Sequence, residues 1–112
     1  MTALFSRPGV TVSEENATLV VTGDVEVSLA AELAASGVKW LKQTELTTIS
    51  LDFSRVEKAS SVAISVLFEW LRTCRRRGIQ VQAILLSVPL NRLASLAELD
   101  ALIEHPASAL AV

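Results

Sequence analysis

The stretch from Ile49 to Trp70 constrains the fold of this chain more than any other part of its sequence. Apolar residues alternate along Thr47–Phe53, as in a strand that buries one face. A short polar turn follows, and a helix is expected from Ser60 to about Arg77, because Gly78 is a strong C-terminal stop signal. The sequence therefore predicts a strand–turn–helix unit whose helix begins with two adjacent hydroxyl side chains.

Strand and helix patterns also alternate along the rest of the chain. We expect further strands at Val10–Ser13, Ala17–Thr22 and Ile79–Leu86, and further helices from about Ser28 and over Leu90–Leu99. Such alternation is typical of an α/β fold, here a small mixed sheet of about four to five strands covered by about three to four helices.

Finer expectations concern the first and last helices. Ser28 is the expected N-cap of the first helix, and Gly37 is expected to weaken or bend that helix. Residues 102–103 are expected to form a last short extended piece. The side chains of the final helix that are expected to face inward are Leu93, Leu96 and Ala97.

The length of 112 residues fits a single domain, with residues 1–8 and 106–112 expected to be loose tails. A hydrophobic fraction of 51% indicates either a surface that needs a partner or a well-filled small core. No apolar run approaches the roughly 18–20 residues of a membrane helix, and the start lacks the pattern of a secretory signal. We therefore expect a cytoplasmic protein without direct membrane insertion.

Charge and reactive residues argue against several functions. The net charge of −2 argues against nucleic acid as the main ligand. Cys74 is the only cysteine, which excludes an internal disulfide and a thiolate metal cluster, and its helical setting indicates a buried apolar residue. His105 is the only histidine and lies near the end of the chain. The basic residues cluster in one place, at Arg72, Arg75, Arg76 and Arg77. Cations near the C-terminus of a helix complement its dipole, which is sufficient to explain this run.

The helix after Ser60 has two faces when residues are spaced by 100°. The expected core face contains Ala63, Val66, Leu67, Trp70 and Cys74. The expected solvent face contains Ser61, Ser65, Phe68, Arg72 and Arg76, with Ile64 at its edge. Two exposed apolar side chains beside polar groups favour a protein contact site, while the alternative is that Phe68 packs at the rim of the core.

Ser60 and Ser61 have three candidate roles. A hydroxyl at this position can cap the helix, receive a phosphate, or act as a nucleophile. Nucleophilic catalysis is the weakest of these, because no Gly-x-Ser-x-Gly elbow surrounds either serine and no phosphate-binding glycine loop is present. The sequence gives no support for an enzyme.

A family resemblance rests on the same residues. The run Asp52-Phe-Ser-Arg-Val56, followed after three residues by Ser60-Ser-Val-Ala63, resembles the signature of STAS domains, the fold of anti-sigma factor antagonists. Residues 56–70 resemble the matching stretch of MlaB-like proteins, the cytoplasmic STAS subunits of the bacterial Mla phospholipid ABC transporter, which maintains outer-membrane lipid asymmetry. Residues 89–99 are similar to the final helix of the family.

The resemblance implies a role for Ser61. STAS antagonists have their phosphorylatable serine at this position, and MlaB-like proteins have a Ser or Thr there, in the surface that binds the ATPase subunit. Ser60 stands where the family usually has Asp, and Val62 replaces a small residue. Loss of the Asp counts against a phosphorylation switch, because in the antagonists it helps to define the site that the kinase recognises.

The resemblance implies a non-enzymatic STAS subunit, peripheral to the inner membrane through its partner. It would bind and stabilise the ATPase of a phospholipid-transporting ABC complex, and act through that ATPase on the permease. No catalytic residue, cofactor or metal is expected. The residues expected to bind the partner are Ser60, Ser61, Ile64, Ser65, Phe68 and Arg72.

Other functions stay open. One is an anti-sigma factor antagonist that is switched by phosphorylation at Ser61. Another is a STAS module that binds a small ligand or a nucleotide. In the absence of an ATPase, the same apolar face could also pair two copies into a homodimer.

Overall fold

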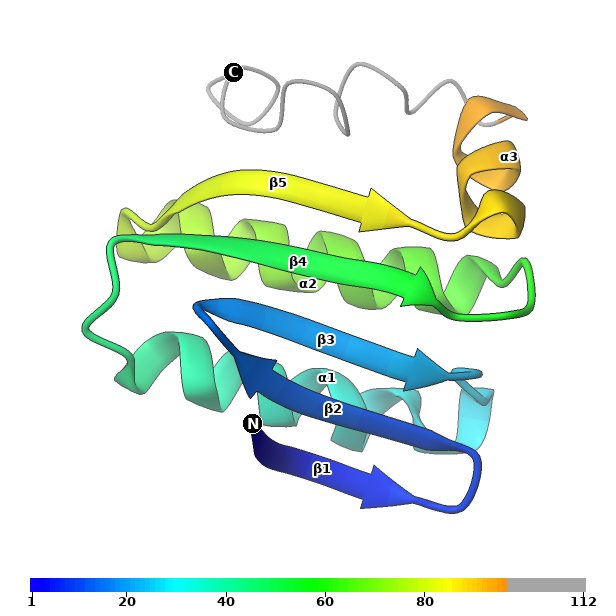
Figure 1. The fold of residues 1–112 in the computed structure, drawn as a ribbon, viewed down its shortest axis with the longest axis horizontal. Helices are drawn as coiled ribbons and strands as arrows, with labels where there is room; N and C mark the ends of the chain where they lie inside the picture. The colour runs from blue at the N-terminus through cyan, green and yellow to red at the C-terminus, as the bar shows by residue number, and fades with distance from the viewer. Residues whose placement is uncertain (97–112) are drawn as a thin grey trace.

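The computed structural model describes residues 1–96, which form one five-stranded sheet and three helices (Figure 1). Their order along the chain is β1 (Thr2–Arg7), β2 (Val10–Glu15), β3 (Thr18–Gly23), α1 (Val27–Gln43), β4 (Thr48–Arg55), α2 (Ser61–Arg77), β5 (Gln80–Leu86) and α3 (Val88–Leu96).

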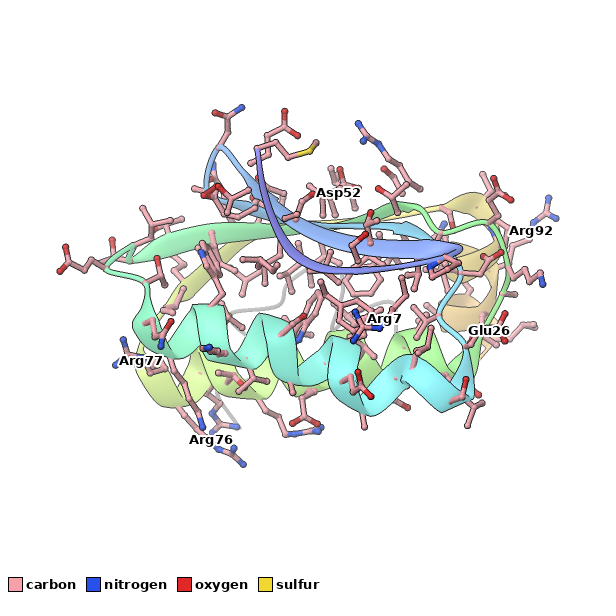
Figure 2. All side chains as sticks on the ribbon, turned by 90° about the horizontal axis from the view of Figure 1, so that it is seen from below. Arg7, Glu26, Asp52, Arg76, Arg77 and Arg92 are labelled. Carbon is pink, nitrogen blue, oxygen red and sulfur yellow. The ribbon has the colours of Figure 1, made fainter. Side chains whose placement is uncertain are left out.

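The strands lie in the sheet in the same order as in the chain, β1-β2-β3-β4-β5. The first three are antiparallel neighbours, whereas β3, β4 and β5 run parallel to one another. Parallel neighbours need a crossover, and two right-handed crossovers that advance in the same direction place their helices on the same face of a sheet. Figure 2 shows the result, with α1 and α2 together below the sheet.

The core lies between this helix layer and the sheet. Alternate residues of the strands face the helices, and those of β4 are Ile49, Leu51 and Phe53, each at most 1% exposed. On α2, the expected core residues Ala63, Val66, Leu67, Trp70 and Cys74 are all buried. Burial raises the pKa of the Cys74 thiol to about 11, so this side chain is a neutral packing residue at physiological pH.

The first strand is a correction to the expected fold. Residues 1–8, expected to be a loose tail, contain β1, which pairs antiparallel with β2 and buries Phe5 against the core. A β-bulge between Ala3 and Phe5 interrupts the alternation of this strand, so its pattern is weak in the sequence. The expected tail at 106–112, the extended piece at 102–103, Ala97 and His105 lie outside the described residues.

The ends of the helices differ from expectation in detail. Helix α1 begins at Val27 with Glu26 as N-cap, so Ser28 lies inside its first turn. Helix α3 begins at Val88, and its first turn is supported by Ser87, whose hydroxyl accepts a hydrogen bond from the Leu90 N–H group at 3.4 Å. The final helix packs through Leu90, Leu93 and Ala94, whereas Leu96, expected to face inward, is 83% exposed.

Gly37 has a different role from the expected bend. Helix α1 continues through it, and the indole of Trp70 lies directly against its backbone, where a Cβ atom would overlap ring atoms. The indole N–H group donates a hydrogen bond to the carbonyl of Ala34 at 2.9 Å, and the ring of Phe53 packs on the indole with a centroid distance of 5.5 Å. Gly37 therefore allows α1, α2 and β4 to meet at one tryptophan.

We predict that Gly37→Ala destabilises the protein by up to about 2 kcal/mol, because overpacking costs about 1–3 kcal/mol and the gain in helix propensity offsets about 1 kcal/mol of that cost. Chemical denaturation measures this change in the free energy of unfolding. A double-mutant cycle with Trp70→Phe is the control, since the smaller ring should reduce the penalty. A Gly37→Ala variant more stable than the parent would contradict the proposed close contact.

Candidate functional site

The candidate site begins where β4 ends. The Asp52 carboxylate accepts hydrogen bonds from the Ser54 N–H group at 2.8 Å and from the Ser54 hydroxyl at 2.6 Å. Such a local bond from an Asp side chain to the backbone two residues later stabilises a turn. The side chain of Val56 is then buried again, only 1% exposed, and the chain leads over 57–59 to the start of α2.

A second carboxylate fixes the segment before α2. Asp24 follows β3 directly, and its Oδ1 atom accepts hydrogen bonds from the N–H groups of Glu57 at 3.1 Å and Lys58 at 2.9 Å. The Asp24 N–H group donates to the carbonyl of Gly9 at 3.1 Å, which ties this residue to the turn between β1 and β2. The position of the α2 N-terminus is therefore set by a residue more than thirty positions earlier in the chain.

Sequence reasoning missed this role of Asp24. The only signal was its place in the pair Gly23-Asp24 directly after a strand, which is typical of a turn and names no partner.

Ser60 is the N-cap of α2. Its backbone is extended, with φ −135°, and its hydroxyl accepts a hydrogen bond from the N–H group of Ala63 at 3.4 Å. Capping of this kind satisfies one of the free N–H groups of the first helical turn. The first candidate role of the serine pair therefore falls to Ser60, whose side chain is half-buried.

Ser61 is the first residue of α2 and is exposed. Its carbonyl accepts a hydrogen bond from the hydroxyl of Ser65 at 3.0 Å. Among residues 1–96 the Ser61 hydroxyl itself has no hydrogen-bond partner. This hydroxyl therefore points to solvent at the positive end of a helix dipole, where a partner or a phosphate can reach it.

Four of the expected contact residues form one line along α2, here named the α2 stripe: Ser61, Ser65, Phe68 and Arg72. Their spacing of four, three and four residues keeps them within one narrow face of a helix. Ser61, Ser65 and Arg72 are exposed, and Phe68 is half-buried with part of its ring packed on the core. Arg72 also pairs with Glu69 at 3.5 Å, an exposed ion pair of small energetic value.

Ile64 does not belong to this stripe. It was expected at the exposed edge of the helix, but only 7% of it is exposed and it is part of the core. The reason is that α2 packs against α1, the sheet and α3, so its buried face is wider than a helix lying on one layer requires. Leu71, on the same side as Ile64, is fully buried as well.

A pocket of about 620 Å³ lies beside the α2 N-terminus, at the carboxyl ends of the parallel strands. It is lined by the ends of β3 and β4, the turn at 54–57 and residues 87–89. Its ionisable side chains are Arg55 and Glu57, and it contains no nucleophile paired with a base. Among residues 1–96, no cluster of His, Cys, Asp and Glu could hold a metal ion, and no helix is long and apolar enough to cross a bilayer.

Comparisons with known proteins agree with this geometry. The family model described as "Mlab, STAS domain" matches residues 9–104. Among solved structures, the chain is similar to the unphosphorylated form of the anti-sigma factor antagonist SpoIIAA, with a TM-score of 0.63 and 15% identity over 80% of this chain and 81% of that chain. No curated protein matches the sequence significantly.

The structural similarity to SpoIIAA concerns the fold, because the identity is low. It confirms the predicted α/β architecture, a mixed sheet with helices packed on it. The family match covers the strand–turn–helix unit, the turn that Asp52 and Asp24 stabilise, and α3. This chain belongs to the MlaB-like STAS domain family.

Proposed function

We propose that this protein is a non-enzymatic subunit that binds the ATPase of a phospholipid-transporting ABC complex through the N-terminus of α2 and the α2 stripe. In this role it would be cytoplasmic and peripheral to the inner membrane. The observation that carries the proposal is the exposed Ser61 hydroxyl, without a partner among the described residues, at the head of an ordered stripe in an MlaB-like domain.

The chemistry of the stripe suits a protein contact. Aromatic residues and Arg are enriched at the centres of interfaces, and here Phe68 and Arg72 lie one turn apart below two hydroxyls. The site is also preorganised, because Asp24 holds the preceding turn and Ser60 caps the helix. Because this helix face is already ordered, binding of a partner to it costs little conformational entropy.

The mechanism we propose is a shift of equilibrium. An ATPase subunit exists in several arrangements on its permease, and a protein that binds the active arrangement best raises the population of that arrangement. Such a subunit acts through a shaped surface and needs no reactive group.

The proposal is tested by purifying the tagged chain from detergent-solubilised membranes of its host and identifying its partners by mass spectrometry. Recovery of an ABC ATPase with its permease supports it. Recovery of a kinase-like anti-sigma factor without a transporter would contradict it and favour the second candidate function.

That second candidate is an anti-sigma factor antagonist switched at Ser61. The observation in its favour is the position of the hydroxyl at a helix N-terminus, where a phosphate dianion is stabilised by the dipole and by free N–H groups. Ser60 in place of the usual Asp disfavours it. Stoichiometric phosphate on Ser61, in protein isolated from its host, would reverse our ranking of the two functions.

We predict that Ser61→Glu weakens binding of the recovered ATPase roughly tenfold to a hundredfold, because an unpaired carboxylate would be desolvated in the contact. Titration calorimetry or biolayer interferometry measures this loss. The matched control is Ser28→Glu, which places the same charge in the exposed first turn of α1. Equal affinities of the Ser61→Glu variant and the parent would exclude Ser61 from the interface.

We predict that Phe68→Ala weakens binding of the ATPase by about 1–3 kcal/mol, as truncation of an aromatic anchor does. Phe68 also touches the core, so the unfolding free energy must be measured in parallel. Leu29→Ala is the control, since Leu29 is a half-buried α1 residue packed against the same core. A loss of stability without a loss of affinity would assign Phe68 to the core alone.

A further inference from the structure

The basic residues of this protein are concentrated at one end of the helix layer. Helices α1 and α2 both return from the carboxyl end of a strand to the amino end of the next, so their C-termini lie at the same end (Figure 1). Six of the ten Lys and Arg residues of the chain lie there, and all six are exposed. This group, here named the basic end, contains Lys39, Lys42, Arg72, Arg75, Arg76 and Arg77.

Acidic residues offset only part of this charge. Among residues 1–96, Glu45 and Glu69 are the acidic residues at the same end of the helix layer, so six cations and two anions leave four positive charges there. The β2–β3 hairpin brings Glu14 and Glu15 to this end of the sheet. When these two residues are included, a net charge of two positive charges is left at this end. The whole chain, in contrast, has a net charge of −2.

The helix dipoles do not account for the whole cluster. Two helix C-termini carry about −0.5 charge each, roughly −1 in total, and their effect fades within the last turn. Arg77 serves this purpose directly, because its guanidinium donates to the carbonyls of Leu41 at 3.4 Å and Thr44 at 3.5 Å. Lys39 and Arg72, however, lie before the last turn. Among residues 1–96, Lys39, Lys42 and Arg76 take part in no ion pair.

An exposed leucine lies beside these cations. Leu46, in the loop between α1 and β4, is 41% exposed. Its loop is tied to the basic end, since Arg77 donates to Thr44 and the Gln80 N–H group donates to the carbonyl of Thr47 at 2.8 Å. A cluster of cations with an apolar side chain next to it is typical of a surface that rests on a lipid headgroup layer.

We propose that the basic end binds the anionic surface of a phospholipid bilayer, by adsorption without insertion of a helix. Lipid is favoured over the other common polyanion, nucleic acid, because every aromatic ring in residues 1–96 is buried or half-buried, which leaves none fully exposed for base stacking. Each Lys or Arg close to an anionic leaflet strengthens partitioning roughly fivefold, so several acting together give reversible, salt-sensitive binding.

This surface is separate from the start of the partner site. Figure 2 shows Arg76 and Arg77 at one end of the molecule, and Glu26 and Arg92 at the opposite end. A helix of the length of α2 spans about 25 Å at 1.5 Å per residue, which separates Ser61 from Arg76 and Arg77. Arg72 belongs to both surfaces, so it is left out of the vesicle-binding variant described below. The bilayer contact therefore goes beyond the proposed ATPase contact and does not depend on it.

The test is co-sedimentation of the purified full chain with vesicles. We expect binding to vesicles that contain phosphatidylglycerol, little binding to vesicles of phosphatidylcholine alone, and loss of binding as ionic strength rises from about 20 mM to about 500 mM. The triple variant Lys39→Gln, Lys42→Gln, Arg76→Gln should bind the anionic vesicles roughly a hundredfold more weakly. Leu46→Ser should weaken binding by a smaller factor.

The matched control removes the same charge from the opposite end. The variant Arg55→Gln, Lys58→Gln, Arg92→Gln alters three exposed cations near the carboxyl ends of the strands and in α3, and it should retain vesicle binding. Equal losses in the two triple variants would overturn the proposal, because net charge alone would then explain them. Failure of the parent to sediment at low salt, or its displacement from vesicles by a short DNA duplex in preference to lipid, would overturn it as well.

Failure of this proposal is distinguishable from failure of the proposed function. Vesicle binding is measured without the ATPase, and ATPase binding can be measured in detergent without vesicles. All three residues of the triple variant are exposed, so its unfolding midpoint should equal that of the parent, and a lowered midpoint would overturn the assignment of its vesicle defect to charge.

Discussion

The contact between the Trp70 indole and the backbone of Gly37 is the constraint on which the rest of the structure depends. It sets how closely the two long helices approach, because Gly37 has no side chain to hold the Trp70 indole away from the α1 backbone. The same indole satisfies its polar N–H group on α1 and packs on Phe53 from the sheet. Since α2 carries the candidate site on its opposite face, the position of that site relative to the sheet follows from the packing around one tryptophan.

Local patterns explain which parts of this fold were predictable. The strand–turn–helix unit from β4 to Gly78 contains an alternating strand pattern, a helix cap and a helix stop signal, and all three are present in the structure. Strand β1 has no such pattern, because its conformation is imposed by pairing with β2 across a bulge. The burial of Ile64 depends on how many helices and strands surround α2. A helical wheel gives no information on these neighbours.

The candidate site divides in the same way. The cap at Ser60, the exposed Ser61 and the spacing of the α2 stripe follow from the sequence, because they are properties of one helix. The role of Asp24 does not, since its partners are backbone N–H groups that any residue could supply. The basic end was visible in the sequence as a run of arginines, but the addition of Lys39 and Lys42, with Leu46 beside them, requires the parallel arrangement of the two helices.

The link from Asp24 to residues 57 and 58 also has a consequence for folding kinetics. The hydrogen bonds from Glu57 and Lys58 to Asp24 join residues 33 and 34 positions apart, so they form only after closure of a loop that includes all of α1. Contacts between residues so distant in sequence are expected to form late in folding, because closure of a long loop costs more entropy than formation of a helix or a hairpin. A partner that recognises this turn therefore discriminates between a fully folded subunit and a nascent or partly unfolded chain, and only the former would be admitted to an assembly.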